Sequence, residues 1–329
     1  MTQENEKGTF GVAPGVPFSK KIPVLKKEGN HFMKKKKQIS PKKRREVLTA
    51  YGMLLPDVLG LLVFVFIPIV YAFYISLHSW TGLSDMDFIG FGNYFKMFKD
   101  RMFRKSLIVT AKYAFMYVPC VFLMALMMAN LLSALHKKVQ TFFRTMFFLP
   151  YAISTVIAGI VWSFIYNPMQ GFLNQILVFA GIEKQRFLAS PTQALPSIVA
   201  VSVWLVLGYN TILFLSAIKD VPRDYYESAE LDGAGPVKKF FSITLPLIKE
   251  TTIFVLITCT ISSFQAFDQI RVMTEGGPAS ATTTSVLYIY KEAFSTYEMG
   301  YASSLAFVLF LLIMVLTVLQ MVLTRKKER

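Results

Sequence analysis

The chain has 329 residues, of which 54% are hydrophobic, and its mean hydropathy is +0.47. Soluble domains are less apolar than this, so the composition indicates an integral membrane protein. The formal net charge of +15 does not indicate nucleic-acid binding, because the lysines and arginines concentrate before residue 50 and beside apolar runs. Both cysteines, Cys120 and Cys259, lie inside apolar segments, which argues against a disulfide framework or a zinc site.

Residues 1–49 form a polar and basic N-terminal segment with scattered proline and glycine. We expect this segment to be a disordered cytoplasmic tail. It is not expected to be a cleavable signal peptide, because the first apolar run begins near Tyr51 and is too long for one. Met33, which four lysines follow, is an alternative to Met1 as the start of translation.

Residues 50–329 contain six runs with the roughly 20 mostly apolar residues that are needed to cross about 30 Å of hydrocarbon. The predicted fold is therefore an all-α, polytopic membrane domain with six transmembrane helices. The six spans are predicted at residues 53–79, 107–133, 142–166, 195–217, 251–273 and 300–324.

Lysine and arginine residues flank these spans unevenly. Most of them fall in the tail, in the loops after spans two and four, and at the C-terminus. Because cytoplasmic loops are enriched in these residues, we expect both termini and the loop at 218–250 to be cytoplasmic. Lys112, one turn into span two, is expected to reach outer headgroups. The loop between spans one and two is expected on the outer side, yet it contains five cations that argue against this orientation: Lys96, Lys99, Arg101, Arg104 and Lys105.

Polar side chains within spans four and five are the candidates for a solute pathway, because polar groups inside a membrane are costly and usually face a cavity or another helix. In span five, Ser262, Gln265 and Gln269 are predicted to share one helical face, with Asp268 beside it. In span four, Asn210 follows Gly208 and Tyr209, and this tripeptide is predicted to interrupt helical packing. The alternative is structural, with serine hydroxyls bonded to their own helix, Asp268 paired with Arg271, and span four as a simple helix crossing.

The loop at 218–250 is charged, and prolines and a glycine divide it. Pro222 suits the first turn of a helix and Gly233 its end, so a helix is predicted over 223–231. Pro236 is predicted to open a second helix that stops or kinks at Pro246. The apolar face of this second helix would consist of Val237, Phe240, Phe241 and Leu245.

The first of these helices carries the sequence Tyr226-Glu227-Ser228-Ala229-Glu230-Leu231-Asp232-Gly233, and Ile243, Leu245 and Pro246 follow. This spacing resembles the EAA motif of permease subunits of ATP-binding-cassette importers, with Ser228 in place of the first alanine. The resemblance implies a coupling helix that docks into a cytoplasmic ATPase. Glu227 would meet the ATPase, Ala229 would pack closely and Gly233 would allow the tight turn. The polar neighbours Ser228, Glu230 and Asp232 complete the candidate docking set.

An alternative for the same segment is an interfacial amphipathic helix with no partner. Such helices carry lysine or arginine on the polar face, which meets anionic lipid. Here Glu227, Glu230 and Asp232 would meet the lipid, and their charge has the wrong sign.

Three short segments resemble the carbohydrate branch of this family: residues 91–94 (FGNY), 147–151 (FFLPY) and 276–278 (GGP). The resemblance implies a type I importer permease in the bacterial plasma membrane that forms half of a pathway for a sugar. It also implies a second homologous permease subunit, an ATPase dimer and an extracytoplasmic solute-binding protein as partners.

The sequence has no G-x-x-x-x-G-K-[ST] loop, no H-E-x-x-H and no C-x-x-C. We therefore expect no catalytic residue, metal site or cofactor, and ATP hydrolysis in a partner chain. No lysine or arginine falls at mid-membrane, which favours a neutral solute. The alternatives are another neutral or phosphorylated polyol such as glycerol-3-phosphate, or an ion-coupled secondary transporter, which would need mid-membrane carboxylates.

Overall fold

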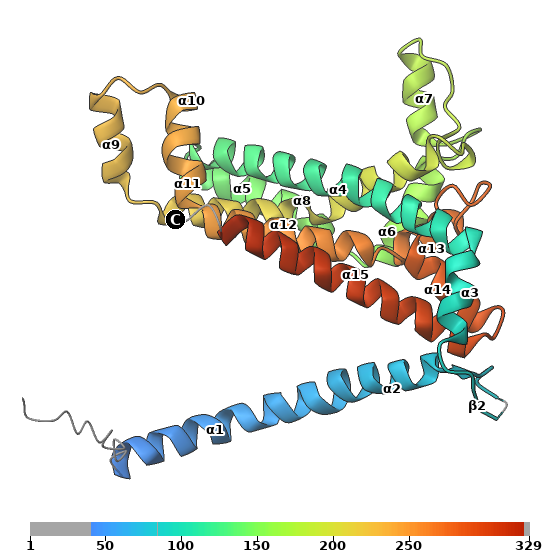
Figure 1. Cartoon of the computed structure of the whole chain (residues 1–329). Helices are drawn as coiled ribbons and strands as arrows, with labels where there is room; N and C mark the ends of the chain where they lie inside the picture. The colour runs from blue at the N-terminus through green and yellow to red at the C-terminus, as the bar shows by residue number, and fades with distance from the viewer. Residues whose placement is uncertain (1–40, 84, 326–329) are drawn as a thin grey trace, which may run out of the picture. The chain divides into compact units, whose positions relative to one another are not determined.

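The computed structural model describes residues 41–83 and 85–325 (Figure 1). The choice between Met1 and Met33, and most of the predicted tail, lie outside these residues. The described chain divides into two units, Met1–Leu59 and Gly60–Arg329. The described part of the first unit belongs to helix α1 (Pro41–Leu61), so residues 41–49 are helical rather than disordered.

The second unit begins with the end of α1, a short π-helix η1 (Leu62–Phe66) and α2 (Ile67–Ser76). Two short strands follow, β1 (His78–Ser79) and β2 (Asp87–Phe88), and they pair antiparallel with His78 opposite Phe88. This pair is the only β-structure in the described residues. The prediction of an all-α fold is otherwise confirmed.

The remaining elements are all helical. In chain order they are α3 (Gly92–Lys99), α4 (Arg101–Ser133), α5 (Lys137–Phe148), the 3₁₀ turn η2 (Leu149–Ala152), α6 (Thr155–Ile165), α7 (Phe172–Phe179), the 3₁₀ turn η3 (Phe187–Ala189), α8 (Ala194–Asp220), α9 (Arg223–Leu231), α10 (Pro236–Lys239), the π-helix η4 (Phe240–Thr244), α11 (Leu245–Leu247), α12 (Lys249–Phe264), α13 (Asp268–Thr274), α14 (Ser285–Phe294) and α15 (Met299–Arg325).

Four described helices are long and apolar enough to cross a membrane, and the number rises to six if each of two bent pairs counts as one span. The four are Arg45–Ser76, Arg101–Ser133, Ala194–Asp220 and Met299–Thr324. One bent pair lies at predicted span three, where the chain turns by 96° between Ala152 and Thr155. The other joins the segment Pro236–Leu247 to α12 with a bend of 74° before Lys249, just ahead of predicted span five. Predicted span five breaks further on, between the end of α12 at Phe264 and the start of α13 at Asp268, so neither 142–166 nor 251–273 is one continuous helix.

The core of the second unit lies where α4, α8 and α12 pack together (Figure 1). Fully buried residues of this core include Val121 of α4, Ile198 and Phe214 of α8, and Val255 of α12. α8 contributes buried residues on most of its sides, which is typical of a helix in the centre of a membrane bundle.

Gly208 lies at the closest contact in this core. A Cβ atom at this position would lie 1.9 Å from the carbonyl oxygen of Phe147 and 2.7 Å from the backbone nitrogen of Phe148. The backbone of α8 therefore contacts the backbone of α5 directly, which requires glycine. Residues 208–210 are predicted to interrupt helical packing, but α8 runs through them and packs closely against α5 at Gly208.

The loops gather at the two ends of this bundle. α9, α10 and the last residues of α15 lie at one end, and α3, α7 and α14 lie at the opposite end (Figure 1). The predicted coupling loop and the loops after the first, third and fifth predicted spans are thus separated by the length of the bundle.

Candidate functional site

The candidate coupling helix has the predicted bounds. Helix α9 spans Arg223–Leu231, with Pro222 as its N-cap residue and Asp224 in its first turn, where a negative charge is favourable. After α9, Gly233 adopts φ +73°, a conformation that costs other residues energy. The backbone N–H of Ala234 donates to the Ala229 carbonyl at 2.8 Å and closes the turn. The prediction that Gly233 permits a tight turn is confirmed.

Two side-chain contacts join α9 to the segment that follows it. The hydroxyls of Tyr226 and Thr244 lie 2.9 Å apart in a hydrogen bond. The Lys239 ammonium lies 2.5 Å from Glu230 Oε1 in an ion pair. Tyr226 is half-buried and packs against the core, and Thr244 is buried. α9 is therefore fixed to the transmembrane bundle through its inner side.

The outer side of α9 is open. Glu227, Ser228 and Asp232 are exposed, and Ala229 is half-buried. Leu231 is 90% exposed and Tyr225 is 54% exposed. Neither residue belongs to the predicted docking set, although an apolar side chain within a charged surface helix is a signal that could have identified both. Burying exposed apolar area stabilises an interface, so both residues suit a contact with another protein.

The second helix of the loop differs in part from the prediction. Helix α10 begins at Pro236 as predicted, but the chain continues through η4 and α11 and breaks at Ile248, two residues after Pro246. Of the predicted apolar face, Phe240 and Leu245 pack against the core. The other two, Val237 at 70% and Phe241 at 62%, are exposed.

The pathway candidates of span five do not share one helical face. α12 ends at Phe264, Gln265 is its C-cap residue, and α13 begins at Asp268. Ser262 therefore lies on one helix while Asp268 and Gln269 lie on the next. The predicted i, i+3, i+7 alignment is wrong because it assumed a helix through residues 265–267.

A distant side chain stabilises this helix break. The Thr284 hydroxyl donates to the carbonyl of Ala266 at 3.0 Å, and both residues are buried. A backbone carbonyl released from a helix must find another donor when water is absent. Thr284 supplies that donor from a position 18 residues away in the chain.

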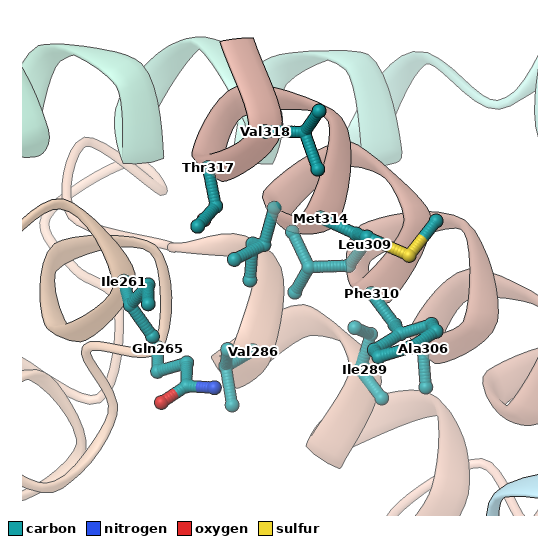
Figure 2. A pocket seen from close by; sticks show the side chains of 11 residues that line it. Ile261, Gln265, Val286, Ile289, Ala306, Leu309, Phe310, Met314, Thr317 and Val318 are labelled. Carbon is teal, nitrogen blue, oxygen red and sulfur yellow. The ribbon is translucent and has the colours of Figure 1, made fainter. Parts of the chain in front are cut away.

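Gln265 faces a cavity of about 540 Å³ between α12, α14 and α15. Figure 2 shows its amide group beside Val286 of α14, with Leu309 and Phe310 of α15 on the other side. None of the residues that line this cavity is charged. Gln265 and Ser262 are exposed within the single chain, as is Asp268, whereas Gln269 is half-buried.

The structural alternative for span five is supported for a serine but not for Asp268. The Ser263 hydroxyl donates to the carbonyl of Thr260 at 2.7 Å, as the alternative expected. The expected ion pair of Asp268 with Arg271 is not among the ion pairs of residues 41–83 and 85–325. Instead, the Arg271 guanidinium lies 4.1 Å from the centre of the Tyr290 ring.

Asn210 occupies a different environment from the other candidates. It is only 4% exposed, and its amide donates to the Val206 carbonyl one turn earlier in α8, at 3.0 Å. The structure therefore does not bring Asn210 to an open surface of this chain, and it does not place Asn210 beside Gln265 in the cavity.

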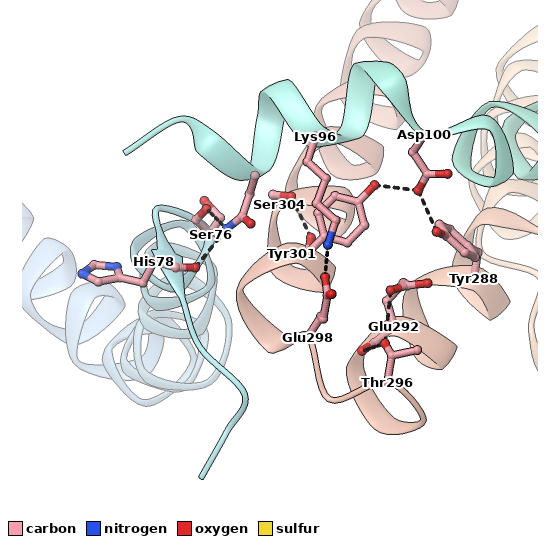
Figure 3. A network of polar contacts seen from close by, with 11 residues as sticks. Ser76, His78, Lys96, Asp100, Tyr288, Glu292, Thr296, Glu298, Tyr301 and Ser304 are labelled. Atoms are coloured by element: carbon pink, nitrogen blue, oxygen red, sulfur yellow. Dashed lines mark hydrogen bonds and ion pairs between the residues drawn. The ribbon is translucent and has the colours of Figure 1, made fainter. Parts of the chain in front are cut away.

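At the opposite end of the bundle, Asp100 joins three helices (Figure 3). Its side chain accepts hydrogen bonds from the hydroxyls of Tyr288 and Tyr301, both at 2.6 Å. It also caps α4 by accepting from the backbone N–H groups of Met102 and Phe103. Nearby, Lys96 forms an ion pair with Glu298 and lies 4.3 Å from the centre of the Tyr301 ring.

We expect Asp100→Asn to destabilise the chain by about 1 kcal/mol at neutral pH, because a neutral amide accepts these bonds less strongly. Burial raises the pKa of Asp100, but the tyrosine and backbone donors outweigh it, and the pKa lies below its ordinary value. Because the pKa of Asp100 is lower in the folded chain, its ionised carboxylate stabilises the fold fully at any pH above the unfolded-state pKa of about 4. This stabilisation is lost as the pH falls below that value. Thermal unfolding in detergent should thus separate parent and variant at pH 7 and bring them together below about pH 4.

The exposed Asp87→Asn is the matched control for this change, since it removes an acid from the same loop region without such bonds. It should leave the unfolding temperature unchanged. Equal unfolding temperatures for Asp100→Asn and the parent at pH 7 would contradict the role assigned to Asp100.

Comparisons with known proteins agree with this architecture. Residues 121–329 match the family described as "Binding-protein-dependent transport system inner membrane component". The chain is 36% identical over 275 residues to the probable ABC transporter permease protein YurN of Bacillus subtilis, covering 82% of this chain and 94% of that protein. It is 34% identical to the trehalose/maltose transport system permease protein MalF of Thermococcus litoralis, covering 84% and 93%.

A solved structure shares the fold. The crystal structure of a bacterial ABC transporter involved in the import of the acidic polysaccharide alginate contains a chain that aligns with a TM-score of 0.76. The identity is 22%, and the alignment covers 87% of this chain and 98% of that chain.

The chain belongs to the family of inner-membrane components of binding-protein-dependent transport systems. It is a multi-pass membrane protein and a permease subunit, which is a non-catalytic component of an ABC importer. The resemblance inferred from the EAA-like spacing is confirmed.

Proposed function

We propose that this chain forms half of the translocation pathway of an ATP-driven importer for a sugar or a related polyol, and that α9 docks a separate ATPase. The observation that carries the proposal is the geometry of α9. Its inner side is fixed by the Tyr226–Thr244 hydrogen bond and the Lys239–Glu230 ion pair. Its outer side presents Glu227, Ser228 and Leu231. Because α9 is short and fixed on its inner side, a displacement of its outer side by a bound protein would move the attached bundle as well.

The remaining partners follow from this arrangement. A permease with a single α9 docks one ATPase subunit, so an ATPase dimer requires a second, homologous permease. The end of the bundle that carries α9 would face the cytoplasm, and the opposite end would face an extracytoplasmic solute-binding protein. A solved ABC transporter of this fold was crystallised with a periplasmic protein bound to an alginate pentasaccharide, which supports the same assembly here.

The helix break at residues 265–267 is the proposed position of the solute. α12 has 16 residues and is about 24 Å long, which is less than the hydrocarbon thickness of about 30 Å. The break then lies within the membrane, where irregular backbone occurs only if it is buried in protein or lines a water-filled cavity. Ser262, Gln265, Asp268 and Gln269 would line this part of the pathway. The burial of Asn210 does not support a direct role for it.

The solute class is supported by the relatives. They include the permease MalF of a trehalose/maltose transport system, the permease SmoG of a sulfoquinovosyl glycerol system of Agrobacterium fabrum, and the permease UgpA of an sn-glycerol-3-phosphate system of Escherichia coli. The solutes in these names are glycosides or derivatives of a polyol. The cavity beside Gln265 has no cation to hold a phosphate or sulfonate, so a neutral polyhydroxylated solute is favoured over glycerol-3-phosphate.

Glu227→Lys tests the docking function. A reversed charge at the centre of the interface is expected to weaken the binding free energy by about 1–2 kcal/mol, which lowers the affinity for the ATPase about 5- to 30-fold. The tagged chain should be purified from the bacterium that encodes it, and ATPase recovery quantified by mass spectrometry. We expect an ABC ATPase with the parent chain and much less with the variant, at equal membrane abundance.

Glu183→Lys is the control, because it makes the same change on an exposed residue between α7 and α8, at the other end of the bundle. It should not alter ATPase recovery. Equal ATPase recovery with the parent and with Glu227→Lys would refute docking through α9. Uptake of a panel of labelled sugars by the same strains would identify the solute.

A further inference from the structure

Helix α4 carries a row of cations on its first three turns. Arg101, Arg104, Lys105 and Lys112 are all exposed, and spacings of three, four and eleven residues place them on one side of a helix. They lie at the end of the bundle opposite α9 (Figure 1). Lysine and arginine are usually enriched on the cytoplasmic side of membrane proteins, whereas these four lie at the end of the bundle that is expected to be extracytoplasmic.

These four cations line one cavity of about 1190 Å³ between α4 and the start of α8. Thr192, Leu195 and Pro196 form the opposite wall, and no acidic residue lines the cavity. The Lys105 ammonium donates to the carbonyl of Ala279 at 2.8 Å. Neither of the two ion pairs found in residues 41–83 and 85–325 includes any of the four cations. Their charge therefore has no acidic counterpart in the described chain.

An apolar groove continues from this cavity along the same two helices. It has a volume of about 620 Å³ and shares Phe115, Met116 and Pro196 with the cationic cavity. Its other lining residues include Met124 of α4 and Val203 of α8, and none is charged. Phe115 is 80% exposed.

The length of the groove matches one leaflet of a bilayer. From Lys112 to Met124 is twelve residues, or about 18 Å along a helix, and half of a hydrocarbon core is about 15 Å. The cations then lie at the depth of the headgroups and the apolar groove lies at the depth of the acyl chains.

We propose that this groove binds an anionic phospholipid in the leaflet opposite the coupling loop. The headgroup phosphate contacts Arg104 and Lys112, whose side chain extends toward the start of α4, while Arg101 adds positive charge one turn further out. One acyl chain lies along Phe115, Met116 and Val203. Each lysine or arginine near a membrane surface attracts anionic lipid, and arginine binds phosphate oxygens through two parallel N–H groups. A free phosphate ion would use the cations but not the groove, and a zwitterionic lipid would leave the positive charge uncompensated.

The test uses the assembled transporter, reconstituted in phosphatidylcholine nanodiscs with and without phosphatidylglycerol. We expect phosphatidylglycerol to raise the unfolding temperature of the parent, and lipid extraction and mass spectrometry to show it enriched over the supplied ratio after transfer to detergent. Inorganic phosphate added to the phosphatidylcholine sample should have no effect. An equal effect of phosphate, or equal stability in both lipids, would overturn the proposal.

Variants locate the lipid. Arg101→Gln combined with Arg104→Gln is expected to weaken phosphatidylglycerol retention about 10- to 30-fold. The control is Lys99→Gln combined with Lys184→Gln, which removes the same amount of charge. Both residues are exposed, one on α3 and one between α7 and α8, and neither lines the cationic cavity or the apolar groove. The control pair should retain the lipid. Equal losses in both pairs would assign the effect to net charge and overturn the proposal.

Ala200→Trp tests the apolar groove separately. Ala200 is exposed and lines the groove, so tryptophan fills it without entering the core. We expect this variant to lose phosphatidylglycerol while its four cations remain. Unchanged retention would show that no acyl chain lies in the groove.

Discussion

Replacing Gly208 with valine is expected to remove most of the folded chain from the membrane. The first added carbon would lie 1.9 Å from the Phe147 carbonyl oxygen, and backbone atoms cannot rotate away as a side chain can. Overpacking of a core costs about 1–3 kcal/mol when side chains can adjust, and a backbone clash costs at least the upper end of this range. Against a typical stability of about 5–15 kcal/mol, we expect membrane abundance to fall severalfold and the unfolding temperature to fall by several degrees.

Gly60→Ala is the control for this prediction. Gly60 is also helical, but a Cβ atom there would meet nothing within 4 Å. This change should leave abundance and unfolding temperature at the parental values. Parental abundance of Gly208→Val would show that α8 and α5 do not pack as closely as described.

Gln265→Leu and Asp268→Asn are expected to reduce uptake about 5- to 100-fold at matched membrane abundance. The reason is that a solute hydroxyl loses a hydrogen-bonding partner in a low-dielectric pathway, at about 1–3 kcal/mol. The measurement is the initial rate of uptake of the solute identified for the parent strain. If these side chains only pack helices, Gln265→Leu should transport normally, since leucine has a similar volume.

Gln175→Leu provides the matched change outside the pathway. Gln175 is exposed on α7, and its side-chain amide donates to the carbonyl of Gln170 within the same loop region. Parental uptake in Gln175→Leu and in both pathway variants would exclude these side chains from the solute site and would favour the proposed second permease as its location.

Local signals predicted the bounds of the candidate coupling helix well. Pro222, Asp224 and Gly233 fix the bounds of α9 through capping, charge and backbone conformation, which depend on neighbouring residues alone. The class of protein was also predictable, because hydropathy and the spacing of the motif are properties of the sequence itself.

The helix break in span five could not be predicted in the same way. Gln265, Ala266 and Phe267 include neither proline nor glycine, so nothing local opposes a helix. The structure places the buried Thr284 hydroxyl on the Ala266 carbonyl, and this bond forms only after the chain has folded. Tertiary contacts likewise bury Asn210, where its polarity alone suggested an open pathway.

The contact at Gly208 has a mechanical consequence for α8. This helix continues without a break from Ala194 to Asp220, and α9 follows after Val221 and Pro222. Gly208 lies about 18 Å from one end and about 21 Å from the other, since each residue adds about 1.5 Å. Rotation of the rigid rod by about 10° around this point would move its two ends in opposite directions by about 3–4 Å. If an ATPase docks on α9 as proposed, a small displacement of α9 would become a similar displacement of the opposite end of α8.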